Sequence, residues 1–175
     1  MGKGSRGTAV DDLSDFVRIF HKNINKHKKL EPKHFKRLSR IVRNNMVSQF
    51  LKLLSTFTNN ECIVIGRAIM KNKMDDFDEL VDFLVSRKSK YHIIILTCTL
   101  CKGRKLKNVD SVRNYIKSFF GDENGINFYK LIMVAGRKYR DILDDDILAF
   151  CRNNEHPILK EVLKEYESQS CVVSK

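Results

Sequence analysis

Apolar residues recur at helical spacing along most of the chain. The first such set, three or four positions apart as on one face of an α-helix, is Leu13, Phe16, Val17 and Phe20. Asp11 or Asp12 can cap this helix, which is expected to end between residues 22 and 25. The stretch that follows, up to residue 30, is polar and basic.

A second helix is expected to start at Glu31-Pro32, since proline is tolerated in the first turn of a helix. At about 100° per residue, the positions from residue 33 onward divide into two faces. The apolar face consists of Phe35, Leu38, Ile41, Val42 and Met46. The opposite face covers an arc of about 120° and consists of Lys33, Lys36, Arg37, Arg40 and Arg43. The apolar pattern continues through residues 47–54, either in the same helix or in a new one after Asn44-Asn45.

The remainder shows a weak internal repetition. Three apolar segments each end in Gly-Arg, namely CIVIGR (62–67), IIILTCTLCKGR (93–104) and INFYKLIMVAGR (126–137). Each is followed by acidic residues and another amphipathic stretch, at a period typical of helical-pair repeats. The pattern is also what unrelated amphipathic helices produce. If the hairpins stack, the cations near the Gly-Arg positions are expected to line one edge as a positive track. The alternative is ordinary helix C-terminal chemistry, in which glycine terminates the helix and the cations complement its negative end.

These patterns predict an all-α protein, either a compact bundle or a short array of stacked helical hairpins, with about 7–10 helices. Only residues 91–96 are β-branched enough to suggest a strand. We expect a flexible leader at 1–10, a single domain at 11–167 and a flexible tail at 168–175. Within the domain, a basic part (11–58) precedes a helical-hairpin part (59–167), and residues 156–166 form a last amphipathic segment.

Composition narrows the class of protein. Apolar residues make up 42% of the 175 residues, which argues against a disordered chain. The longest apolar run, nine residues from Ile93 to Cys101, is too short to span a membrane, and the N-terminus has no hydrophobic signal segment. An intracellular protein, cytoplasmic or nuclear, is therefore expected. The Lys-, Asn- and Ile-rich composition would suit an AT-rich genome, as in some large viruses.

Positive charge is concentrated near the N-terminus. The chain has 33 Lys and Arg against 21 Asp and Glu, a net charge of +12, and residues 1–58 contribute +9 of it. Such a segment attracts polyanions, whether nucleic acid or anionic lipid, unless it serves only solubility. The primary candidate contacts are Arg18, Lys22, Lys26, Lys28, Lys29, Lys33, Lys36, Arg37, Arg40 and Arg43. A second set follows two of the Gly-Arg positions and consists of Lys102, Arg104, Lys105, Lys107, Arg137, Lys138 and Arg140.

The sequence offers little for catalysis or metal binding. The five cysteines form an odd set, so reduced thiols are expected, and Cys98 with Cys101 lacks the partners of a zinc site. The acids at 144–146 precede an apolar helix and are interpreted as an N-cap. No phosphate-binding glycine loop or hydrolase motif is present. We expect no enzyme, no metal and no cofactor.

Residues 125–136, GINFYKLIMVAG, resemble the central-helix signature of Bcl-2-type proteins, written around Asn-Trp-Gly-Arg. Asn127 matches, Phe128 stands for Trp and Lys130 for Arg, whereas Tyr129 replaces the small glycine. The resemblance covers about 12 of the 175 residues and does not assign the chain to that family. It implies a helical bundle that holds a partner's amphipathic helix in an apolar groove.

Three function classes follow from these observations. The first is a nucleic-acid-binding protein that contacts phosphates through a basic helical face, with RNA or single strands favoured over a specific duplex and little sequence specificity. The second is a protein-interaction bundle with an apolar groove, and the third is a protein bound to anionic membrane surfaces. A homo-oligomer is compatible with each.

Overall fold

All the secondary structure of the described residues is helical. The structure is a computed structural model that describes residues 9–54 and 57–171 and, for residues 9–11, the backbone alone. These ranges contain ten α-helices, one short 3-10 helix and no strand, which confirms the predicted all-α class. Residues 91–96 lie in a helix. Residues 1–8 of the predicted leader and 172–175 of the predicted tail lie outside the described residues.

Two compact units divide the chain, residues 1–75 and residues 76–175. Unit 1 contains α1 (Ala9–His27), α2 (Pro32–Arg43), α3 (Val47–Leu53) and α4 (Asn59–Lys71). Helix α1 packs on α3, and α2 packs on α4. The sequence prediction placed its internal division between residues 58 and 59, whereas α4 falls within unit 1.

Aromatic packing forms the centre of unit 1. Phe16, Phe20 and Phe50 are fully buried, and the Phe50 ring centroid lies 5.7 Å from Phe16 and 5.4 Å from Phe20. The sequence interpretation of Phe16 and Phe20 as core residues is confirmed. Phe35 is half-buried, with the Lys71 ammonium 5.5 Å from its ring centroid.

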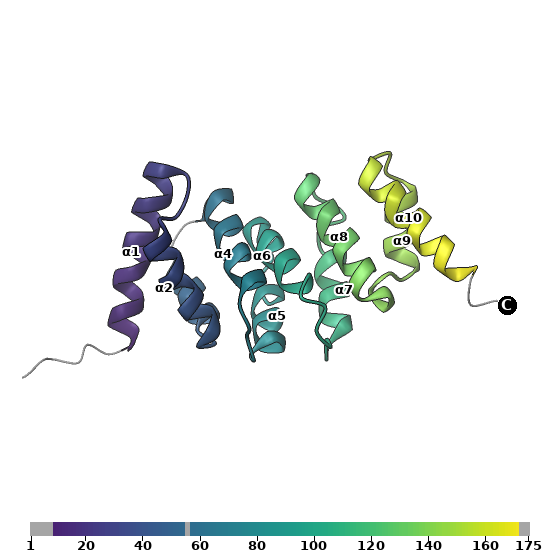
Figure 1. Cartoon of the computed structure of the whole chain (residues 1–175). Coiled ribbons are helices and arrows are strands. Elements are labelled where there is room, and N and C mark those ends of the chain that lie inside the picture. Colours follow the sequence, from purple (N-terminus) through teal and green to yellow (C-terminus); the bar gives the residue numbers. More distant parts are fainter. Residues whose placement is uncertain (1–8, 55–56, 172–175) are drawn as a thin grey trace, which may run out of the picture. The chain divides into compact units, whose positions relative to one another are not determined.

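Two residues in the left-handed backbone region set the limits of α2. Lys28 (φ 57°) ends α1 and Asn45 (φ 58°) ends α2. The Met46 amide donates to the carbonyl of Ile41, and the Asn45 amide donates to that of Val42. The chain therefore reverses at Asn44-Asn45, so the second helix does not extend to residue 54, and α3 is a separate element. Helices α1 and α2, joined by the connection at residues 28–31, run antiparallel (Figure 1).

Unit 2 consists of the remaining helices in sequence. They are α5 (Phe77–Val85), α6 (Lys90–Leu100), α7 (Val109–Lys117), α8 (Ile126–Lys138), the 3-10 helix η1 (Arg140–Ile142), α9 (Asp145–Arg152) and α10 (Pro157–Ser170). The α8 helix packs on both α6 and α10. Asp144 caps α9 by accepting a hydrogen bond from the Ile147 amide, which confirms the interpretation of the triple acid as an N-cap.

The expectation that each Gly-Arg ends a helix is wrong at two of the three positions. Gly66 and Gly136 lie inside α4 and α8, and only Gly103 follows a helix end, at φ 61°. Gly136 instead packs closely against the side chain of Leu143. A Cβ there would lie 2.7 Å from Leu143 Cδ1 and 3.2 Å from Leu143 Cγ, and Leu143 is itself buried. The Gly-Arg spacing therefore does not mark one recurring structural position.

Gly136→Ala is expected to destabilise the protein by about 1–2 kcal/mol, because overpacking costs about 1–3 kcal/mol while alanine regains up to about 1 kcal/mol of helix propensity. Urea unfolding followed by circular dichroism measures the change. Gly121→Ala is the matched control, since no atom lies within 4 Å of a Cβ at that position. Equal stability of the two variants would contradict the packing argument.

Candidate functional site

The α1–α2 hairpin of unit 1 brings ten of the predicted basic residues onto one supersecondary element. Nine are exposed and are called here the α1–α2 basic surface: Arg18, Lys22, Lys26, Lys28, Lys29, Lys33, Lys36, Arg40 and Arg43. Arg37, the tenth, is half-buried. The surface comprises two helices and the four-residue connection between them.

Helical periodicity explains the exposure of these cations. Arg18, Lys22 and Lys26 recur every four residues along α1 and lie within about 80° of one another around the helix axis. On α2 the cations lie opposite the buried residues Leu38, Ile41 and Val42. The two-faced division of α2 predicted from the sequence is thus present, because its apolar face is buried in unit 1.

Most of these cations have no acidic neighbour. Arg18 pairs with Asp15 at 2.9 Å, Lys33 Nζ lies 3.3 Å from Glu31, and Arg43 donates to the amide oxygen of Asn72. The side chains of the others make no hydrogen bond or ion pair with any described residue: Lys22, Lys26, Lys28, Lys29, Lys36 and Arg40. The hydrogen bond and positive charge of Lys33 hold the pKa of Glu31 below its usual value.

Arg37 differs from its neighbours because it joins the two helices. Its guanidinium forms an ion pair with Asp12 on α1 and lies 4.8 Å from the ring centroid of Phe16. Arginine favours such a position, since its planar group can stack on a ring while it pairs with a carboxylate. Beside it, a hollow of about 190 Å³ opens between α1 and α2.

His21 lies within the basic sequence but serves a structural role. Its Nδ1 is hydrogen-bonded to the carboxylate of Glu61, which is 1% exposed. Glu61 also accepts from the amide of Thr58, and Thr58 Oγ1 accepts from the Glu61 amide, which together form the capping box of α4. This imidazole therefore links α1 to α4 and is not part of the exposed cation set.

The second predicted set lies in unit 2, around the connection from α6 to α7. Lys102 and Lys107 belong to this connection, and a shallow hollow of about 380 Å³ is lined by Arg104, Lys105, Lys138 and Arg140. Burial lowers the pKa of Lys102, and the charge of Arg104 adds to this effect. Asp141 also lines the hollow, and Asp78 accepts from the amide of Lys107. The positive charge of this region is accordingly offset in part.

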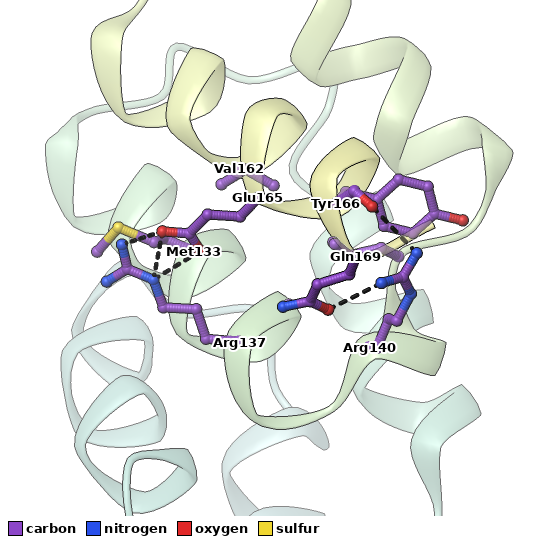
Figure 2. A pocket seen from close by; sticks show the side chains of 9 residues that line it. Met133, Arg137, Arg140, Val162, Glu165, Tyr166 and Gln169 are labelled. Carbon is purple, nitrogen blue, oxygen red and sulfur yellow. Dashed lines mark hydrogen bonds and ion pairs between the residues drawn. The ribbon is translucent and has the colours of Figure 1, made fainter. Parts of the chain in front are cut away.

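Two members of the second set are engaged with α10 (Figure 2). Arg137 forms a two-pronged pair with Glu165 that raises the pKa of Arg137 and lowers that of Glu165. The Arg140 guanidinium donates to the Gln169 side chain at 2.8 Å and lies 4.3 Å from the ring centroid of Tyr166. Both arginines therefore join α8 and η1 to α10.

The charge balance differs between the two units. Unit 1 has 16 Lys and Arg against 6 Asp and Glu, a net charge of +10, while unit 2 has 17 against 15, a net charge of +2. Of the acids in unit 1, Glu61 is buried and Asp12 is paired with Arg37. The electrostatic attraction for anions is concentrated in unit 1.

The described residues contain no group of three or more His, Cys, Asp or Glu side chains that could hold a metal ion. Within the same ranges, no helix is long and apolar enough to cross a membrane. Cys98 and Cys101 are half-buried in and next to α6, and burial raises the pKa of the Cys101 thiol. The α1–α2 basic surface can bind anions at several points along two helices.

Sequence reasoning missed the hollow beside Arg37. Its lining includes the apolar residues Leu13, Ile41 and Met46 and the polar residue Asn44. In the sequence, Leu13 and Ile41 belong to ordinary apolar helix faces, and Asn44 belongs to a turn signal. Only the antiparallel return of α2 along α1 brings these positions together.

Comparisons with known proteins identify no family: no family model, no curated protein and no solved structure matches the chain. The fold and the site define the chain only as an all-α protein with a strongly basic helical hairpin.

Proposed function

We propose that this protein binds nucleic acid through the α1–α2 basic surface, contacting phosphates with little dependence on sequence. The observation that carries the proposal is the set of six exposed cations on this hairpin that have no partner among the described residues. A cation already paired within the protein gains little from a phosphate, because it must first lose its own carboxylate. An unpaired cation binds phosphate and releases condensed counterions, which favours association.

The distribution of these cations favours a backbone contact over base reading in a groove. Lys22, Lys28 and Lys29 lie at the α1 end and the connection, whereas Lys36 and Arg40 lie along α2. A surface composed mainly of lysines on two helices and a turn tracks a charged backbone, and lysine acts on phosphate as a point charge. An apolar-groove module has no comparable observation in its favour. The same cations also fit an anionic membrane surface, so the experiment below compares the two.

Fluorescence anisotropy of the full-length protein with a labelled 20-nucleotide single strand and a matched duplex tests the proposal. We expect micromolar or tighter binding at low salt. Log K should fall against log salt with a slope of about −2.8 or steeper, as for four or more phosphate contacts on a single strand. Vesicles containing phosphatidylserine are the comparison. The absence of binding to either nucleic acid at low salt, or preferential binding to the vesicles, would contradict the proposal.

A further inference from the structure

The hollow between α1 and α2 adjoins the α1–α2 basic surface. Its volume is about 190 Å³. Its lining combines apolar and polar side chains, namely Leu13, Phe16, Ile41 and Met46 with Asp12, Arg37, Arg40 and Asn44. An apolar lining with a few convergent polar groups is the usual composition of a small-ligand site, but pockets for drug-sized ligands have volumes of about 300–1,000 Å³. This hollow is smaller and matches a single aromatic ring system in size.

Arg37 gives the hollow a flat, fixed element. The guanidinium is held by the Asp12 carboxylate and by the Phe16 ring, and its side chain remains 29% exposed. An arginine plane held in this way needs little further ordering to stack against a second planar group. Unpaired bases in protein complexes stack on arginine planes as well as on aromatic rings.

We infer that this hollow holds one unpaired nucleobase of a strand whose phosphates lie on the α1–α2 basic surface. The inference rests on the proposed function and adds the substrate class, a single strand. Arg40 lines the hollow and is also part of the α1–α2 basic surface, so a phosphate bound to Arg40 lies next to the hollow. A duplex keeps its bases paired and stacked inside, so it cannot fill the hollow without losing a base pair.

The polar groups that line the hollow allow any of the four bases. Asn44 is exposed, and its side-chain amide carries both donors and an acceptor, which can serve purine or pyrimidine edges. Stacking on Arg37 is also tolerant of base identity, because every base has a π-face. We therefore expect homopolymers of different bases to bind with similar affinity.

Two ten-nucleotide DNA strands with equal numbers of phosphates test the inference, one of thymidines and one of abasic sites. The full-length protein should bind the thymidine strand about 5-fold to 160-fold more tightly, the range found for stacking one base. A third strand, with 2-aminopurine between thymidines, reports stacking directly through a decrease in its fluorescence.

Arg37→Lys keeps the charge but removes the planar group, so it should abolish most of the 2-aminopurine signal and of the preference for the thymidine strand. Arg67→Lys is the matched control, because Arg67 is an exposed arginine on α4 of unit 1, outside both the hollow and the α1–α2 basic surface, and this variant should leave the signal and the preference unchanged. Unfolding midpoints of both variants verify folding, while the wild-type comparison of the two strands does not depend on any variant.

The outcomes separate this inference from the proposed function. Equal affinity of the wild-type protein for the thymidine and abasic strands would overturn the inference and leave phosphate binding intact. Binding to neither strand would overturn both. A fluorescence change that persists fully in Arg37→Lys would mean that the base stacks elsewhere, which overturns the assignment to this hollow.

Discussion

Simultaneous replacement of Lys29, Lys36 and Arg40 by glutamine is expected to weaken binding of a single strand about 50-fold at 0.15 M salt. Each phosphate contact on a single strand contributes about 0.7 to the salt slope, so the loss of three contacts should also reduce the slope by about 2. Arg37 is left intact, because its pair with Asp12 joins α1 to α2. The anisotropy salt series measures both quantities.

The matched control for this variant removes three exposed cations from unit 2. Lys130, Arg152 and Lys164 are exposed and make no side-chain hydrogen bond or ion pair with any residue in the described ranges. Their replacement with glutamine changes the net charge equally and should reduce affinity much less. Equal losses in the two triple variants would indicate that total charge, not the α1–α2 basic surface, determines binding.

Phe50→Ala is expected to destabilise unit 1 by about 3–5 kcal/mol, the cost of removing a buried phenylalanine. Phe50 is fully buried between Phe16 and Phe20, and the small α3 helix has few other large side chains to fill the space. Urea unfolding gives the overall change, and amide hydrogen exchange in α1 and α3 locates it. Leu53→Ala, on the same helix at 37% exposure, is the control.

Faster exchange in α1 with Phe50→Ala and little change with Leu53→Ala would support the packing described here. A loss below about 1 kcal/mol for Phe50→Ala would contradict it, since the cavity term alone exceeds that value for a well-packed site. Because Phe16 contacts both Phe50 and Arg37, the same variant is expected to loosen the hollow beside the basic surface.

A basic residue in the sequence is not equivalent to a basic residue on a binding surface, as Arg137 and Arg40 show. From the sequence alone, each is a candidate contact for an anion. In the folded chain Arg137 meets Glu165, 28 positions away, while Arg40 meets no acid among the described residues. Charge patterning along a helix cannot distinguish these cases, since the partner comes from another helix.

The sequence by itself determined the helical class, the amphipathic division of α2, the helix start at Glu31-Pro32 and the cap at Asp144. These features depend on periodicity and on residues a few positions apart, which short-range physics fixes. Tertiary structure alone decided the packing role of Gly136 and the hydrogen bond of His21 to Glu61. It also produced the hollow beside Arg37. Each of these depends on contacts between helices, and such contacts leave no local signal because the partners are separated along the chain.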